Sequence, residues 1–274
     1  MSFTTPDGLT YRVADAHTHI YKDKIAKKAS QTIGEFYVTE MAEYEATSEK
    51  LIEHGQTIGC ERYLVCSAAT TVTQVPSINK FIAGECSKHP EFVGLGTAHQ
   101  DIEDPEALCE EILDLGLYGI KLHPDFQKFN IDDPCMLPLY RSAAQAGLIM
   151  LFHVGDERVD FSDPARLARV LEKVPNLKCQ AAHFGCCRTW KRRPLPLADS
   201  DVMYDTSSMS KWASAEDMAE LIDILGIDRM MFGTDFPMWE DVNERDRMLA
   251  IGLSPEDNRK LFYDNFARFY GVED

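Results

Sequence analysis

The sequence lacks an excess of basic residues, a long apolar run and a cysteine framework. Its formal net charge is −17, so we expect neither a nucleic acid nor a membrane surface as a partner, because both bind positive patches. No stretch reaches the roughly 18 apolar residues of a membrane-spanning helix, and the N-terminal residues MSFTTPDGLTYR do not resemble a signal peptide. These absences predict a cytoplasmic protein with a small-molecule partner.

The eight cysteines are spread along the chain without the CxxC spacing of a zinc knuckle. We expect most of them to be reduced and structural. The adjacent residues Cys186 and Cys187 follow His183 closely, but a functional thiol there is the less favoured interpretation.

Internal repeats, low-complexity tracts and linkers are also absent, which predicts one domain over residues 1–274. Strand-like and helix-like segments alternate from end to end, as in a parallel sheet. Eight strands are expected, the number that closes a (β/α)8 TIM barrel. The predicted strands are Arg12–Ala16, Arg62–Ser67, Phe92–Thr97, Gly119–Leu122, Leu148–Phe152, Leu177–Ala182, Val202–Tyr204 and Arg229–Gly233.

Helices are expected between these strands, several of them opened by an aspartate cap before proline. They are Ser48–Ile58, Ser77–Lys88, Pro105–Leu115, Met136–Gln145, Pro164–Glu172, Ala215–Leu225 and a final helix over Ser254–Tyr270. Two long connections, Ile20–Thr47 and Phe184–Asp201, follow the carboxyl ends of strands. Barrels place their catalytic loops at that end, so we expect these two connections to form the walls of a pocket.

What the sequence does contain is a series of ionisable residues where apolar strands end. They are His17, His19, His99, His123, His153, His183 and Asp235. The parallel strands of a barrel aim such side chains into one pocket, and histidine with carboxylate is the usual ligand set of zinc and related ions. The pattern predicts a metalloenzyme with a divalent ion, expected to be zinc.

His17 and His19 can approach one ion from a single strand end because side chains at i and i+2 share a face. His153 is the best third ligand. Asp235 can bind the metal and act as general base toward an attacking water. We therefore predict that these four residues surround one ion.

Three further residues, two from this series and one from within a strand, have open roles. His183 could be a second-metal ligand, a hydrogen-bond partner of the reacting water, or an acid/base group. Lys121 shares a strand face with His123, and a lysine in a barrel core is costly unless it is paired or modified. Lys121 could bind an anionic substrate, pair with a carboxylate, or be carbamylated and bridge two metals; His123 is a candidate substrate contact.

A basic group stands in the second long connection, at Arg188, Lys191, Arg192 and Arg193. Arg188 or a neighbour could meet a substrate carboxylate, since the guanidinium fork suits that contact. The alternative is an ordinary solvated loop.

The motifs DAHTH, GIKLHP, LFHVG, AHFG, YDTSS and FGTDFP, in this order, resemble those of the amidohydrolase superfamily. They look most like its amidohydrolase-related branch, which contains decarboxylases and hydratases as well as hydrolases. The resemblance implies that His17, His19 and His153 are ligands and that Asp235 is both ligand and base. It also implies that His183, at the end of the sixth strand, acts in catalysis or binds a second metal. Lys121 matches the position where two-metal relatives carry a carbamylated lysine, so the number of metals, one or two, stays open.

The leading hypothesis is a metal-dependent hydrolase in which an activated water attacks an amide, lactone or related carbonyl. The alternative is non-oxidative decarboxylation or hydration of a small aromatic or unsaturated carboxylate at the same metal site. A nuclease or phosphoesterase ranks lower, because nuclease relatives carry glutamate where this chain has Lys121 and because the chain is acidic. A non-catalytic binding protein ranks lowest, since no ligand is missing. A homo-oligomer is compatible with a barrel of this size, and no sequence feature tests it.

Overall fold

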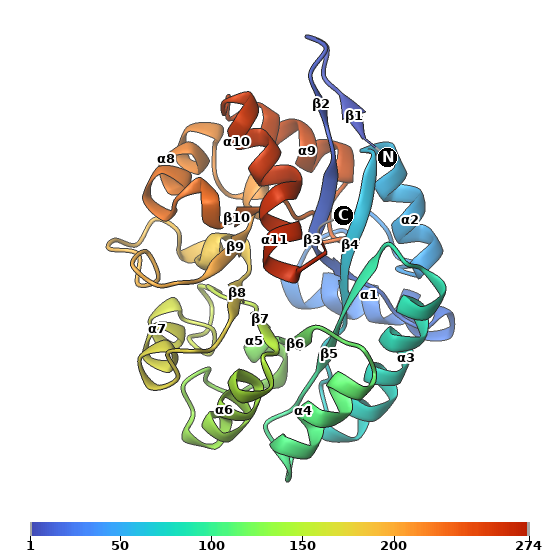
Figure 1. Cartoon of the computed structure of the whole chain (residues 1–274), viewed down its shortest axis with the longest axis vertical. Coiled ribbons are helices and arrows are strands. Elements are labelled where there is room, and N and C mark those ends of the chain that lie inside the picture. The colour runs from blue at the N-terminus through green and yellow to red at the C-terminus, as the bar shows by residue number, and fades with distance from the viewer. Residues whose placement is uncertain (1, 273–274) are drawn as a thin grey trace. The chain divides into compact units, whose positions relative to one another are not determined.

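The computed structural model describes residues 2–272. Eight strands form one sheet in which each strand neighbours the next along the chain, from β3 to β10 (Figure 1). The pairs from β5 to β9 are parallel. The strands are β3 (Val13–His19), β4 (Cys60–Cys66), β5 (Phe92–Thr97), β6 (Gly119–Leu122), β7 (Ile149–Phe152), β8 (Cys179–Ala181), β9 (Met203–Asp205) and β10 (Met230–Met231).

Hydrogen bonds also join the first and last strands of this sheet. The amide of Ala16 donates to the carbonyl of Phe232 at 2.8 Å, and the amide of His19 donates to the carbonyl of Phe236, also at 2.8 Å. Thr18 and Phe236 form a parallel bridge at the same place. The eight strands therefore form a nearly closed barrel, and the predicted (β/α)8 fold is confirmed.

Helices separate the strands along the chain, as the alternation predicts (Figure 1). They are α1 (Asp23–Tyr37), α2 (Ser48–Thr57), α3 (Val75–Lys88), α4 (Pro105–Asp114), α5 (Pro124–Gln127), α6 (Leu137–Ala146), α7 (Pro164–Lys173), α8 (Ala215–Leu225), α9 (Asp241–Leu249), α10 (Pro255–Arg259) and α11 (Asn265–Tyr270). The side chains of Asp104 and Asp163 accept backbone hydrogen bonds at the starts of α4 and α7, with proline in the first turn.

Three helices, α1, α5 and α9, are not among those predicted from the sequence pattern. Helix α1 lies inside the connection Ile20–Thr47, and its buried face consists of the small residues Ala26, Ser30 and Gly34. Helix α9 buries Asp241 and Glu244 together with Met248, so acidic residues take positions that are usually apolar. Hydrophobic periodicity does not reveal α9, because acidic residues occupy its buried face. The predicted C-terminal helix is interrupted by a π-helical segment, Lys260–Asp264, between α10 and α11.

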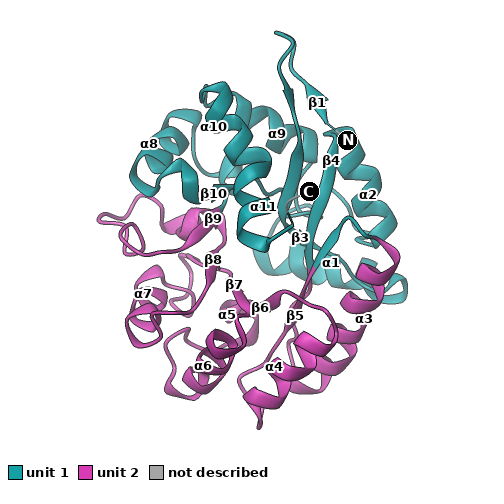
Figure 2. Ribbon diagram, in the orientation of Figure 1, with its two compact units in different colours: residues 1–65, 90–93, 205–274 teal, residues 66–89, 94–204 magenta. Residues whose placement is uncertain are grey.

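The residues of the chain group into two compact units (Figure 2). The first comprises residues 1–65, 90–93 and 205–274, and the second comprises residues 66–89 and 94–204. Both units contain separate stretches of the chain, so no single linker divides them. The single domain over residues 1–274 stays a prediction.

All eight cysteines have free thiols, as expected for a chain without a disulfide framework. Cys186 and Cys187 are both buried, and burial raises the pKa of the Cys186 thiol to about 12. A thiol with so high a pKa is not a reactive nucleophile at neutral pH.

Candidate metal centre

The first unit brings together three of the predicted ligands at the end of β3. His17 and His19 project from the same face of the strand, with ring centroids 5.1 Å apart. One carboxylate oxygen of Asp235, Oδ1, lies 3.8 Å from Nε2 of His17 and 3.4 Å from Nε2 of His19. Ligands bound at about 2.0–2.2 Å to one ion stand roughly 3.0–3.6 Å from each other. The His19–Asp235 distance falls within this range and the His17–Asp235 distance lies slightly above it. The binding of one divalent cation by His17, His19 and Asp235 stays a prediction.

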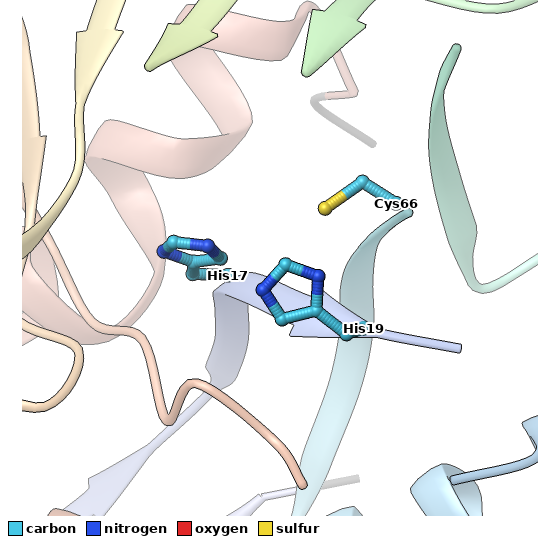
Figure 3. A group of neighbouring side chains, drawn as sticks. All are labelled: His17, His19 and Cys66. Carbon is cyan, nitrogen blue, oxygen red and sulfur yellow. The ribbon is translucent and has the colours of Figure 1, made fainter. Parts of the chain in front are cut away.

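Figure 3 shows the rings of His17 and His19 on β3 together with the thiol of Cys66, the last residue of β4. These three residues, which offer two imidazole nitrogens and one sulfur, make a grouping that could hold a metal ion. The sequence pattern predicts only a structural role for Cys66. Its position at the end of a buried strand is the signal that could have drawn attention to it.

A carboxylate and a hydroxyl hold the imidazole of His17 from behind. Nδ1 of His17 lies 3.0 Å from Oγ of Ser207 and 3.3 Å from Oδ2 of Asp205, and both residues are buried. The Ser207 hydroxyl in turn donates to Asp205. Such partners fix the tautomer and orientation of a ligating histidine, which here leaves Nε2 to face the cation site. The motif YDTSS contains Asp205, but its sequence alone gives this aspartate no role.

Another buried carboxylate, Asp15, joins β3 to the segment that carries Asp235. Its oxygens accept hydrogen bonds from the Thr234 amide at 3.0 Å, the Thr234 hydroxyl at 2.5 Å and the His17 amide at 3.1 Å. Burial raises the pKa of Asp15 to about 7, although the hydrogen bonds from Thr234 act in the opposite direction. Asp15 therefore fixes the spacing between the histidines and Asp235.

The second unit brings together the other predicted histidines. Nδ1 of His153 lies 3.0 Å from Nε2 of His183, a distance that suits either a hydrogen bond or two ligands of one ion. On its other side, Nε2 of His153 lies 3.6 Å from Oδ2 of Asp125. Burial raises the pKa of Asp125 to about 6. The strand-end pattern does not single out Asp125, although it follows His123 and Pro124 in the motif GIKLHPD.

His123 lies in a stack of rings. It is parallel to His153 with centroids 4.1 Å apart and to Phe126 with centroids 3.8 Å apart. Its Nδ1 accepts a hydrogen bond from the Phe126 amide at 3.4 Å. The stack restrains the His153 ring, while the predicted substrate contact of His123 stays a prediction.

His183 begins a tight turn immediately after β8. His183, Phe184 and Gly185 all have positive φ, at 59°, 55° and 64°. For residues other than glycine this conformation costs about 1–2 kcal/mol and persists only where the surroundings impose it. The turn directs the buried His183 ring toward His153, and its role in acid/base chemistry or metal binding stays a prediction.

Lys121 faces the interior of the barrel. The ring of Phe152 on β7 packs against Tyr140 of α6, with centroids 5.5 Å apart, so that side of the sheet faces the helices. Leu122 pairs with Phe152 in the parallel register and shares its orientation. Lys121, one position earlier, therefore points inward, where it is fully buried. This orientation agrees with the predicted alternation, and the part Lys121 plays stays a prediction.

The basic residues of the second long connection have different surroundings. Nη1 of Arg188 lies 3.8 Å from Oε1 of Glu157, and the Arg188 side chain is largely buried. Lys191, Arg192 and Arg193 are exposed, and Arg192 lies 3.6 Å from Asp163. Arg188 is therefore the member best placed to act inside the protein, and its contact with a substrate stays a prediction.

Residues 14–272 match the family model described as amidohydrolase. The chain belongs to the amidohydrolase family. This confirms the resemblance found in the strand-end motifs. Among curated proteins, 2-amino-3-carboxymuconate-6-semialdehyde decarboxylase from Dictyostelium discoideum is 25% identical over 198 residues. The match covers 58% of this chain and 55% of that enzyme, so the chain spans about half the length of the relative.

Solved structures of decarboxylases share the fold. The 5-carboxyvanillate decarboxylase of Novosphingobium aromaticivorans, with bound manganese and 3-methoxy-4-hydroxy-5-nitrobenzoic acid, has a TM-score of 0.75 at 18% identity, over 95% of this chain and 97% of its own. The 2,6-dihydroxybenzoate decarboxylase of Rhizobium has a TM-score of 0.71 at 17% identity, over 96% and 99%. At these identities the likeness establishes the barrel fold. None of the helices in residues 2–272 has the length and hydropathy needed to cross a membrane.

Proposed function

We propose that this amidohydrolase-family chain is a divalent-metal-dependent lyase that decarboxylates a small aromatic or unsaturated carboxylate without oxidation. The observation that carries the proposal is the convergence of Nε2 of His17 and Nε2 of His19 on Oδ1 of Asp235, at 3.8 and 3.4 Å. Relatives in sequence and in fold that are decarboxylases favour this alternative over the leading hypothesis of a hydrolase.

In this proposal His17, His19, Asp235 and His153 hold one cation. A bound divalent cation would act as a Lewis acid toward the oxygen atoms of the substrate. Asp205 orients His17 through Nδ1, and Asp125 does the same for His153 through Nε2. Zinc and manganese both accept this set of nitrogen and oxygen ligands, and the fold relative that contains manganese makes it the first metal to test.

The reaction requires a group that supplies a proton. The bond between the carboxyl carbon and the adjacent carbon breaks, carbon dioxide leaves, and the carbon that keeps the electron pair takes up a proton. We assign this proton to His183, whose Nε2 lies 3.0 Å from Nδ1 of His153 in a buried position. Arg188 and Lys121 are the candidates for binding the substrate carboxylate.

The surroundings of Asp235 suit the role of a metal ligand. A hydrolase of this type uses the aspartate as the base that takes a proton from water. Here Oδ2 of Asp235 already accepts a hydrogen bond from the Ser208 hydroxyl at 2.5 Å, and Oδ1 faces the two histidines. Because Ser208 holds Oδ2, Oδ1 is the oxygen left to face the two histidines, so Asp235 suits the role of a ligand.

The proposal is tested by loading the purified chain with Mn²⁺ or Zn²⁺ and supplying hydroxybenzoates in one panel and amides and lactones in another. We expect release of carbon dioxide from at least one carboxylate, and a loss of at least 100-fold in kcat in His183→Ala with its metal retained. The matched control is His99→Ala, which removes another strand-end histidine, one whose Nδ1 lies 3.3 Å from the carboxylate of Asp101. Turnover of amides or lactones alone would favour the hydrolase and contradict the proposal.

A further inference from the structure

Three side chains of the first unit form a hydrogen-bonded chain that ends on Asp235. The indole Nε1 of Trp239 lies 2.7 Å from Oγ of Ser208, and Oγ of Ser208 lies 2.5 Å from Oδ2 of Asp235. Ser208 and Asp235 are buried, and Trp239 is half-buried. The three residues come from two connections, one after β9 and one after β10.

The direction of this chain follows from the chemistry of its donors. An indole N–H can only donate, so the Ser208 oxygen must accept from Trp239. The Ser208 hydroxyl has a single proton, and the neighbouring carboxylate oxygen, which can only accept when ionised, receives it. Trp239 therefore donates to Ser208, and Ser208 donates to Asp235.

The backbone aims Ser208 and Asp235 at each other. Both residues have a φ of 63°, in the left-handed region. Each such residue costs about 1–3 kcal/mol, and such strain is maintained where the surroundings impose it. The Asp235 amide donates to the His17 carbonyl at 3.0 Å, which attaches this strained residue to the strand of the two histidines.

Trp239 is a well-fixed first donor of these hydrogen bonds, because contacts restrain both its ring and the residue before it. The Trp239 ring carries Lys211 above it, with the ammonium 5.3 Å from the ring centroid. The residue before it, Met238, is buried, and its amide donates to the Asp235 carbonyl at 2.9 Å. The donor that reaches Ser208 is thus tied to the same turn as the carboxylate.

We propose that Ser208 and Trp239 are positioning residues that hold Oδ2 of Asp235 and thereby turn Oδ1 toward the cation site. For the cation itself, this inference rests on the proposed function. If Oδ2 were not held, the carboxylate could rotate and lose its alignment with Nε2 of His17 and His19. The inference also means that the Ser208 hydroxyl is committed to Asp235 and does not contact the substrate.

The first test measures metal affinity without any substrate. The full-length chain is stripped of metal, and its Kd for Mn²⁺ is measured by competition with a chelator. Ser208→Ala should weaken binding about 10–100-fold, the usual effect of losing a group that orients a metal ligand. Trp239→Phe, which keeps a ring and removes only the donor, should weaken it in the same direction by less than Ser208→Ala does.

The matched control is Ser210→Ala. It removes a hydroxyl from the same turn, but that hydroxyl donates to Glu244 and does not contact Asp235. Its Kd for Mn²⁺ should stay within about twofold of the wild-type value. An unchanged Kd in Ser208→Ala, or an equal loss in Ser210→Ala, would overturn the inference.

The second test does not depend on metal. The indole N–H proton of Trp239 is identified in an NMR spectrum of the metal-free chain as the resonance missing from Trp239→Phe. Ser208→Ala should move it upfield, and Asp235→Ala should also move it because the partner of Ser208 is lost. An indole resonance that neither variant moves would contradict the chain of hydrogen bonds, even if Ser208→Ala altered the Kd.

The two tests separate this inference from the proposed function. If the indole resonance moves but the protein binds neither Mn²⁺ nor Zn²⁺, the hydrogen bonds are supported, and both the metal site and the positioning role are rejected. If the wild-type chain binds Mn²⁺, Ser208→Ala loses the expected affinity and no carbon dioxide is released, the positioning role is supported and only the lyase activity is rejected.

Discussion

The two histidines of β3 differ in what surrounds them. His17 is buried and has Asp205 and Ser207 at Nδ1, whereas the side chain of His19 is 12% exposed and faces Asp235 through Nε2. His17 is therefore the candidate ligand whose orientation is most completely determined by the protein. Removing a buried partner of such a histidine should affect the metal more than it affects the fold.

Replacing Asp205 by asparagine tests this orientation. The substitution keeps the shape of the side chain and removes the charge that faces Nδ1 of His17. We expect affinity for Mn²⁺ to fall about 10–100-fold, measured by chelator competition, with little change in the far-UV circular dichroism spectrum. Asp101→Asn is the matched control, since Asp101 lies 3.3 Å from His99 at another strand end. A comparable loss in Asp101→Asn would place the ion elsewhere.

The connections after β7 and β8 depend on a close approach of two backbones. Gly155 has a φ of +100°, and a Cβ atom at this position would overlap the carbonyl oxygen of Cys186. The Arg188 amide donates to the Gly155 carbonyl at 3.0 Å in the same contact. The two connections that follow His153 and His183 can therefore meet only because residue 155 has no side chain.

Gly155→Ala should destabilise the chain by about 2–4 kcal/mol, from the unfavourable φ together with the steric overlap. The measurement is urea unfolding followed by circular dichroism. Gly84→Ala is the control in the same unit, because Gly84 lies within α3 and a Cβ atom added there would have no other atom within 4 Å. That change should stabilise by about 0.5–1 kcal/mol. Equal effects of the two substitutions would exclude the close approach.

The molecule as a whole is acidic, with a net charge of −17, and some of its acidic side chains are buried. Asp241 and Glu244 of α9 are both buried, and burial raises the pKa of Asp241 well above its usual range and that of Glu244 to about 7. Oε2 of Glu244 has no hydrogen-bond partner among residues 2–272. The folded chain therefore keeps protons on these groups at a pH where the unfolded chain has lost them.

The sign of the pH dependence follows from this difference. Between about pH 4.5 and 7 the folded state binds more protons at Glu244 than the unfolded state, so stability falls as the pH rises through this window. A shift from 4.5 to about 7 corresponds to roughly 3 kcal/mol at most. Glu244→Gln should remove this loss and raise the Tm at pH 8 more than at pH 5, measured by scanning calorimetry. A variant with the same increase at both pH values would refute the assignment.

The barrel and most of its strand ends could be predicted from the sequence because each depends on local patterns. An apolar run that ends in a histidine specifies both a buried strand and a polar residue at its end, as in LIMLFH before Val154 and in KCQAAH before Phe184. The i and i+2 spacing places His17 and His19 on one face without any knowledge of the rest of the chain.

The partners of those residues were decided only by the tertiary structure. Ser208 lies 27 positions from Asp235 and 31 from Trp239, and Asp205 faces a histidine close to the other end of the chain. No local pattern connects such residues. The contacts of Ser208 form when the connections after the neighbouring strands β9 and β10 meet, and the contact of Asp205 with His17 forms when the end of the sheet meets its first strand. The strand-end candidate ligands are thus a property of local sequence, whereas the contacts of Asp205, Ser208 and Trp239 with them follow from the assembly of the strands into one sheet, which brings distant side chains within hydrogen-bonding distance.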